Sequence, residues 1–306
     1  MKQRSIILFA LAVFFAGTVF FAGTGFAWEQ GHVKIEPGFK VTEQWDSNIF
    51  YDSTDEKDDF VTLLTPSIAS EFGFGAEGKH KLLMSYLVEL GIFAEYDDQN
   101  YGNHDVNTGV ALDFNDYTLD VNNRFQFTSS RAGTEFENRN LRKIDTFDTV
   151  LGWHFNKIDF DTGYEYYIVD YLSDTLEALN RYENTGWITG YVEVMPKTKG
   201  LLEFTYKNIQ YPDTGGRNAD AFRFMGGVKG DITAKVSGLI KAGFKAKTYR
   251  NSSANDFSNF VAEMGLLYDI NDRTDLTFSY NREPYESTYS NNNYYSGDHF
   301  LADLNY

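Results

Sequence analysis

The sequence predicts an all-β chain that forms an antiparallel transmembrane β-barrel of about fourteen strands, with short periplasmic turns and longer external loops. Three observations lead to this fold class. Apolar and polar residues alternate with a period of two, tight and long connections alternate along the chain, and the N-terminus carries an export signal. The composition agrees, because 27 Phe and 21 Tyr favour strands and only five Pro interrupt them.

Residues 1–27 are predicted to be a cleaved signal peptide. A basic start with Lys2 and Arg4 precedes a long apolar run, and Gly25 and Ala27 stand at the −3 and −1 positions of a cleavage site. An uncleaved signal anchor is the competing interpretation. Cleavage would leave a barrel of residues 28–306 in the bacterial outer membrane, and loss of two cations would move the formal net charge from −17 to −19.

The rest of the composition excludes disulfide bonds and, beyond the N-terminal segment, membrane-spanning helices, and it narrows the possible partners. The chain has no Cys, so disulfide bonds do not hold it together. No later segment approaches the roughly 20 continuous apolar residues of a membrane-spanning helix. Asp and Glu number 44 against 27 Lys and Arg, and this acidity argues against nucleic acid as a partner.

Period-two patterning predicts the individual strands. In "YTLDVNNRFQFT" (117–128) the odd-numbered residues are mostly apolar and the even-numbered residues polar, and "KVSGLIKAGFKAK" (235–247) has apolar even positions and a row of lysines at odd ones. Each segment of about 10–15 residues suits a tilted membrane-spanning strand. The fourteen predicted segments centre on Phe39, Ser67, Leu87, Val110, Val121, Leu151, Tyr164, Thr189, Phe204, Phe224, Ile240, Met264, Phe278 and Ala302.

The connections between these segments alternate in length. Those after even-numbered segments are tight: "GAEGK", "ND", "NK", "PKTK", "GDIT" and "NDR". Those after odd-numbered segments are long and polar, and the first is the acidic stretch at 46–59, followed by others such as "YLSDTLEALNRYEN" and "EPYESTYSNNN". All short turns therefore lie at one end, as in outer-membrane barrels. The acids Asp52, Asp55, Asp58 and Asp59 are interpreted as a solvated external loop, with a Ca²⁺ site as the alternative.

A closed barrel explains this pattern better than a sandwich, because lipid leaves no water to satisfy an open sheet edge. Tyr and Trp near segment ends are typical of the aromatic girdles at the two membrane interfaces. The last segment, "HFLADLNY", alternates and ends on Tyr306, as does the C-terminal signal that barrel-assembly machinery reads. The expected partners are outer-membrane lipid and lipopolysaccharide, that assembly machinery and a polysaccharide.

The polar faces of the segments supply the candidates for pore-lining residues. Two charged rows stand out: Lys241, Lys245 and Lys247 on one segment, and Asp159, Asp161 and Glu165 on another. Opposed rows would create a transverse field across a lumen, whereas the alternative is that these groups pair or are hydrated. The candidates are Glu89, Glu95, Asp120, Arg124, Asp159, Asp161, Glu165, Arg223, Lys241, Lys245, Lys247 and Glu263.

No enzymatic constellation is found. The five His do not stand in a nucleophile, zinc or phosphate-binding motif, and His104 with Asp105 is an ordinary loop pair. The sequence therefore predicts no enzyme, no cofactor and no metal site.

The first predicted hairpin also resembles a known family. "QWDSNIF", an acidic gap and "DDFVTLLTPSIASEF" are similar to the entrance of the outer-membrane β-barrel porin family associated with exopolysaccharide gene clusters. The matching residues are Asp46, Asn48, Ile49, Phe50, Asp58, Asp59, Phe60 and Pro66. The resemblance covers about forty residues and assigns no residue a role. It implies a pore-like barrel and an association with polysaccharide export.

Two functions follow as expectations. The first is a pore that passes polar solutes or guides exopolysaccharide across the outer membrane. The second is a non-conducting barrel that acts as a structural or docking component of a polysaccharide secretion complex. A rim-active enzyme would require Ser and His to converge at one edge of the barrel.

Overall fold

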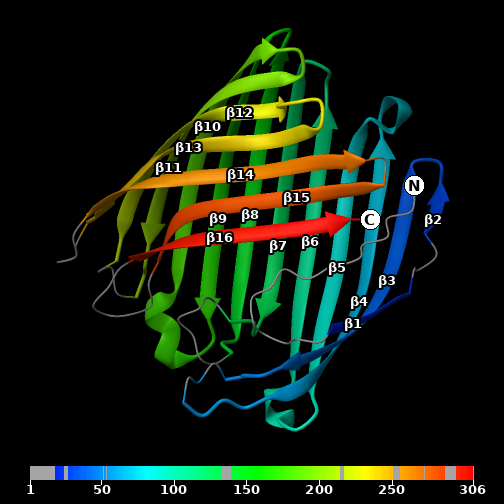
Figure 1. Ribbon diagram of the computed structural model, residues 1–306, viewed down its shortest axis with the longest axis vertical. Coiled ribbons are helices and arrows are strands. Elements are labelled where there is room, and N and C mark those ends of the chain that lie inside the picture. Colours follow the sequence, from blue (N-terminus) through cyan, green and yellow to red (C-terminus); the bar gives the residue numbers. More distant parts are fainter. Residues whose placement is uncertain are drawn as a thin grey trace.

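The computed structural model describes residues 18–23, 27–50, 52, 54–131, 139–213, 217–250, 256–271, 273–286 and 294–305, with the backbone alone at 18–23. Within these residues the chain forms one antiparallel sheet of 16 strands (Figure 1). The strands are β1 (Thr18–Gly23), β2 (Trp28–Gln30), β3 (Val33–Asp46), β4 (Asp59–Phe74), β5 (His80–Phe93), β6 (Tyr101–Asp113), β7 (Tyr117–Thr128), β8 (Arg142–Phe155), β9 (Ile158–Tyr171), β10 (Arg181–Met195), β11 (Thr198–Gln210), β12 (Ala219–Asp231), β13 (Val236–Tyr249), β14 (Phe257–Asn271), β15 (Thr274–Glu286) and β16 (Tyr294–Asn305).

Strands β3 to β16 correspond one to one with the predicted segments, and the all-β barrel-like fold is confirmed. Each pairs with the next along the chain in antiparallel register, and the sheet curls so that β14–β16 cross in front of β6–β9 (Figure 1). Three short 3₁₀ turns, η1 (Ala76–Gly78), η2 (Asp97–Gln99) and η3 (Asp174–Leu179), lie in connections. None of the described helices is long and apolar enough to cross a membrane.

β3 pairs with additional strands that the sequence did not predict. On one side β3 pairs with β4, and on the other it pairs with β2 and with β1, whose residues fall in the predicted signal peptide. Within the described residues β16 pairs with β15 alone, so no ladder joins β16 to β3. The sheet is therefore curled like a barrel, and its first edge is occupied by residues 18–23.

The predicted alternation of connection lengths is also confirmed. Turns of two or three residues link β6 to β7, β8 to β9 and β10 to β11, with Asn115 and Lys197 in the left-handed conformation that tight turns require. The long connections follow β3, β5, β7, β9, β11, β13 and β15.

Several predicted loops are shorter than expected. β15 continues to Glu286 and β10 begins at Arg181, although both stretches were predicted to be loops. The polar residues and Pro284 at these ends resemble loop sequence, but the backbone still pairs, with Pro284 opposite Ser296.

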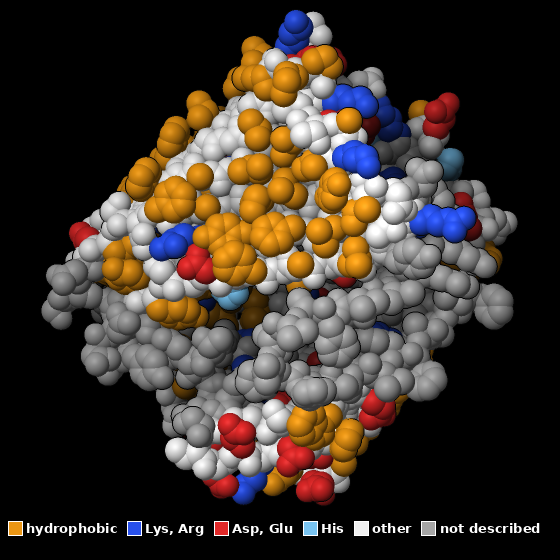
Figure 2. All heavy atoms as spheres, in the orientation of Figure 1, with side chains coloured by type: hydrophobic (Ala, Val, Ile, Leu, Met, Phe, Trp, Pro, Cys, Tyr) orange, Lys and Arg blue, Asp and Glu red, His pale blue; other side chains and the backbone are white. Residues whose placement is uncertain are grey.

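One face of the sheet is apolar and exposed. On β11 Leu202 is 60% exposed while its neighbour Leu201 is 6%, and on β12 Phe224 is 55% exposed against 1% for Met225. Phe244, Phe260 and Phe300 continue this face, and apolar side chains gather over this part of the surface in Figure 2. A soluble sheet would bury such a face, so the exposed apolar surface is typical of strands that face lipid.

The first long connection is organised by its own acids. The Asp46 carboxylate accepts a hydrogen bond from the backbone N–H of Asn48 at 3.0 Å, and the Asp52 carboxylate accepts bonds from the backbone N–H groups of Thr54 and Asp55. Asp55 pairs with Lys57 instead of facing the other acids. Internal contacts thus involve Asp52 and Asp55, two of the four acids for which a Ca²⁺ site was the alternative.

Asp59 has a different role from the exposed acids around it. It is 3% exposed, and its carboxylate accepts backbone N–H groups of Ala94, Glu95 and Tyr96 at 3.0–3.2 Å. It therefore fixes the chain where it leaves β5.

Candidate functional site

The interior face of the sheet is the face opposite the exposed apolar one, and it carries the odd-numbered residues of β9–β15. The strand register aligns these residues in rows across neighbouring strands. One row runs from Trp187 through Thr205 and Arg223 to Lys245, because each of these residues stands opposite the next on β10 to β13. The next row holds Glu165, Thr185 and Lys207.

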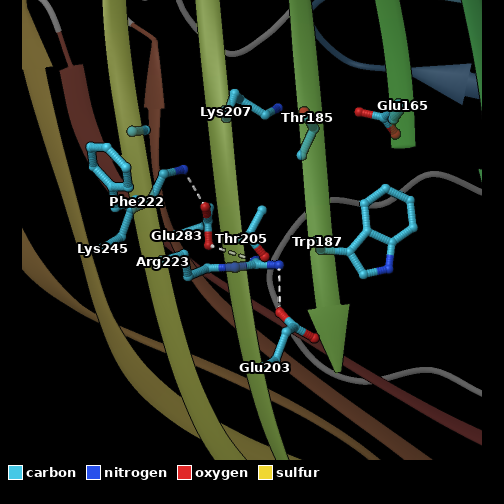
Figure 3. Close-up of a pocket in the computed structure, with 11 residues that line it drawn as sticks. Glu165, Thr185, Trp187, Glu203, Thr205, Lys207, Phe222, Arg223, Lys245 and Glu283 are labelled. Carbon is cyan, nitrogen blue, oxygen red and sulfur yellow. Dashed lines mark hydrogen bonds and ion pairs between the residues drawn. The ribbon is translucent and has the colours of Figure 1, made fainter. Parts of the chain in front are cut away.

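An ion-pair chain crosses this interior face. The Glu203 carboxylate accepts Arg223 Nη2 and Lys241 Nζ, each at 2.9 Å, and Lys241 also reaches Glu263 at 3.0 Å. Arg223 extends to Glu283 at 3.8 Å, and Lys245 pairs with the same Glu283. Figure 3 shows Arg223 between the two carboxylates. Cations and acids from five consecutive strands, β11 to β15, are thereby joined.

A second cluster lies closer to the long connections. The Glu183 carboxylate accepts Arg181 Nε at 2.8 Å and Lys207 Nζ at 2.7 Å, and it is 7% exposed. The Arg181 guanidinium lies over the ring of Tyr167, 5.6 Å from its centroid. Burial of an acid is favourable only when its charge is matched, which two cations achieve here.

Two cavities that share part of their lining lie on the interior face. The inner pocket has a volume of about 300 Å³ and is lined by residues of both rows, including Glu165, Trp187 and Arg223. The outer pocket, about 500 Å³, lies toward the long connections and shares Lys207, Lys245 and Glu283 with the inner pocket. Arg142 of β8 and Tyr295 of β16 both line the outer pocket, so the two walls approach each other there.

Aromatic side chains line the outer pocket. Its tyrosines are Tyr167, Tyr171, Tyr211, Tyr285 and Tyr295. The inner pocket adds Trp187, which lies against Gly163 of β9, since a Cβ at Gly163 would stand 2.1 Å from the indole. The glycine gives the indole room to lie along the interior wall.

Only some of the predicted pore-lining residues come together. Glu165, Arg223 and Lys245 line the inner pocket. Lys241 and Glu263 belong to the ion-pair chain, and Lys247, which is 2% exposed, lies 4.6 Å from the Tyr249 ring centroid.

The other predicted residues lie elsewhere on the sheet. Glu89 accepts the Tyr101 hydroxyl at 3.0 Å, and Arg124 pairs with Asp105. Asp159 pairs with Lys199, while Asp161, Asp120 and Glu95 lie on β9, on β7 and in the connection after β5.

The lysine row of β13 does not oppose the acidic row of β9 as free charge. Lys241 pairs with Glu203 and Glu263 on β11 and β14, and Lys245 pairs with Glu283 on β15. This geometry favours the interpretation that these groups pair within the wall over that of opposed charged rows.

Sequence reasoning did not single out several residues of the site. Thr185, Trp187 and Glu183 belong to the segment with the weakest alternation, where small and apolar residues occur on both faces. Its odd-numbered positions, read by themselves, would have revealed the polar face. Glu283 stood in a predicted loop.

The comparisons with known proteins come from a family model and from solved structures. The family model described as "Putative beta-barrel porin 2" matches residues 28–296. No curated protein matches the chain. The ferric-catecholate import receptor Fiu of E. coli K12 is similar in its closed form, with 11% identity and a TM-score of 0.44 over 90% of this chain and 62% of that one. Its open form is similar with 12% identity and a TM-score of 0.42, over 95% of this chain and 61% of that one. The match thus spans less than two thirds of the receptor's length.

Proposed function

This chain belongs to the family described as "Putative beta-barrel porin 2", and we propose that it forms a pore in the bacterial outer membrane. The pore would pass polar solutes or guide exopolysaccharide from the turn end to the loop end of the barrel. The observation that carries this proposal is the opposition of two faces on the same strands. One face is apolar and exposed, while the other holds charged residues and two neighbouring cavities.

The polymer-guiding role is supported by the lining of the cavities. Five tyrosines line the outer pocket and Trp187 lines the inner pocket, and both pockets also have polar and charged lining residues. Flat apolar rings together with hydrogen-bonding groups suit a chain of sugar rings. Exopolysaccharide is therefore the proposed polymer, and lipopolysaccharide and barrel-assembly machinery are the proposed partners at the membrane.

The second candidate is a non-conducting barrel that docks components of a polysaccharide secretion complex. It is favoured by one specific observation, the approach of β8 and β16 side chains around the outer pocket. An interior narrowed in this way could bind a sugar chain without passing ions.

Single-channel recording in a planar bilayer tests the pore. The refolded protein, with folding verified by heat-modifiable migration on a gel, is expected to give steady openings that neutral oligosaccharides block. Folded protein that never conducts would reject the pore and favour the docking role.

A further inference from the structure

We propose that the inner pocket is a binding subsite for one neutral sugar ring, with Trp187 as its platform and Thr185, Thr205 and Arg223 as its hydrogen-bonding groups. The proposal rests on the proposed passage of saccharide through the interior, and it specifies where and how a sugar is held.

The first support is a set of polar atoms without partners. Among the described residues, Thr185 Oγ1, Thr205 Oγ1 and Arg223 Nε are buried and make no hydrogen bond. Thr185 and Thr205 are each 7% exposed, and all three residues line the same pocket. Buried polar atoms are normally satisfied, so three unsatisfied atoms around one cavity indicate a missing partner.

The chemistry of these atoms matches a polyol. A threonine hydroxyl both donates and accepts hydrogen bonds, whereas the Nε–H of arginine only donates. A sugar hydroxyl can serve either kind of group. A ligand with several hydroxyls on one ring can therefore satisfy all three atoms together.

The second support is the position of the aromatic ring. Trp187 stands directly opposite Thr205 in the register and two residues from Thr185 on the same strand. Side chains opposite one another in a sheet lie within about 5.5 Å at Cβ. From this position the indole extends over Gly163 of β9 (Figure 3), so it lines one side of the pocket that the two hydroxyls also line, and a sugar ring lying on it can direct hydroxyls toward them.

The charge of the pocket favours a neutral ligand. Three acids, Glu165, Glu203 and Glu283, face three cations, Lys207, Arg223 and Lys245. Each of these cations already pairs with a carboxylate, while Glu165 makes no ion pair among the described residues. A carboxylated sugar would meet neutralised cations and an unpaired acid.

The volume sets the size of the ligand. About 300 Å³ lies at the lower end of the roughly 300–1,000 Å³ of ligand pockets, which suits one ring of a chain. Neighbouring rings would extend into the outer pocket, which shares three lining residues.

The test measures binding in detergent micelles, so that it does not depend on conductance. Cellopentaose is the neutral probe and a pentameric oligogalacturonate the anionic one, both followed by calorimetry and tryptophan fluorescence. Wild-type protein is expected to bind the neutral probe more tightly and to show a change in tryptophan fluorescence that Trp187→Leu abolishes.

Four variants locate the binding. Thr185→Val and Thr205→Val keep the side-chain shape, and each is expected to weaken cellopentaose binding about 2- to 10-fold. Trp187→Leu is expected to weaken it about tenfold. Thr42→Val is the control, since Thr42 is 6% exposed on β3 and does not line the pocket.

The outcomes separate this site from the pore itself. Channels that open while cellopentaose fails to bind, or while both valine variants bind it as tightly as wild type does, would overturn the subsite and leave the pore intact. Binding that the valine variants weaken, in protein that never conducts, would support the subsite and reject the pore. Tighter binding of oligogalacturonate would overturn the neutral specificity, and gel migration verifies that each variant is folded.

Discussion

The interior wall formed by β10–β15 differs from the wall formed by β4–β6, although the same alternation of residues builds both. On β10–β15, Glu183, Glu203 and Glu283 each hold two cations and are largely buried. On β4–β6 the pair of Lys81 and Glu71 is 46% and 39% exposed. The buried acid on this wall, Asp59, binds backbone N–H groups at the rim instead of cations.

The difference shows what period-two patterning determines and what it leaves open. The pattern decides which side chains face the interior. Whether a wall becomes a packed network or a hydrated surface depends on which acid and base stand across neighbouring strands. Three changes test this contrast, beginning with the one expected to have the largest effect.

Glu203→Ala should destabilise the barrel most, by about 3–5 kcal/mol, because it leaves Arg223 and Lys241 without their shared carboxylate in a buried position. The measurement is urea unfolding of the protein in lipid vesicles. Glu71→Ala on the other wall is the control, and as an exposed pair it should cost less than about 1 kcal/mol. Equal losses for the two variants would show that the walls are not energetically different.

Asp59→Ala should cost about 2–3 kcal/mol, because three backbone N–H groups lose a buried acceptor. The loss is expected to be local, so native-state hydrogen exchange should speed up at residues 94–96 before it does in β10–β15. Asp59→Asn retains one acceptor oxygen and should lie between alanine and wild type. An unchanged exchange rate at 94–96 would contradict the role assigned to Asp59.

The smallest expected effect is the response to low pH of Asp52, which lies in the connection between β3 and β4. Hydrogen bonds from the backbone N–H and the hydroxyl of Thr54 and from the N–H of Asp55 lower the pKa of Asp52 below its ordinary value of 3.8. The stabilisation is therefore fully present above that value and is lost as the pH falls through the lower pKa of the folded state.

Hydrogen exchange at the amides of Thr54 and Asp55, corrected for intrinsic pH dependence, should therefore accelerate below about pH 4. Asp52→Asn is the matched control and should show no such acceleration, since its side chain does not titrate. If hydrogen exchange depended on pH in the same way in wild type and in Asp52→Asn, a group other than Asp52 would be responsible for the acceleration.

The fold could be predicted from the sequence because its determinants are local. The alternation of apolar and polar residues at 117–128 is typical of a strand. A turn as short as the one at Asn115–Asp116 can only join two antiparallel strands that are neighbours in the sheet. Two features were missed for physical reasons. β2 is three residues long and carries no periodic signal, and β1 pairs through residues that an export signal also explains.

The candidate site was harder to predict because it depends on stagger between strands. The sequence indicates that Lys241 and Glu203 face the same side, but they lie on β13 and β11, two strands apart. Their contact follows from the offset that the turns impose, which no single segment reveals. Trp187 required in addition the glycine on β9, whose purpose is clear only once the two strands are paired.

The tight turns at one end have a consequence for how such a chain can change over time. Because these turns link strands directly, they fix which residues stand side by side within each hairpin. The long connections at the opposite end carry no such constraint. Insertions, deletions or grafted peptides there can change the surface of that end of the molecule, while the interior rows keep their alignment. The long connections can therefore diversify in sequence and length, whereas the strands joined by tight turns must keep their register.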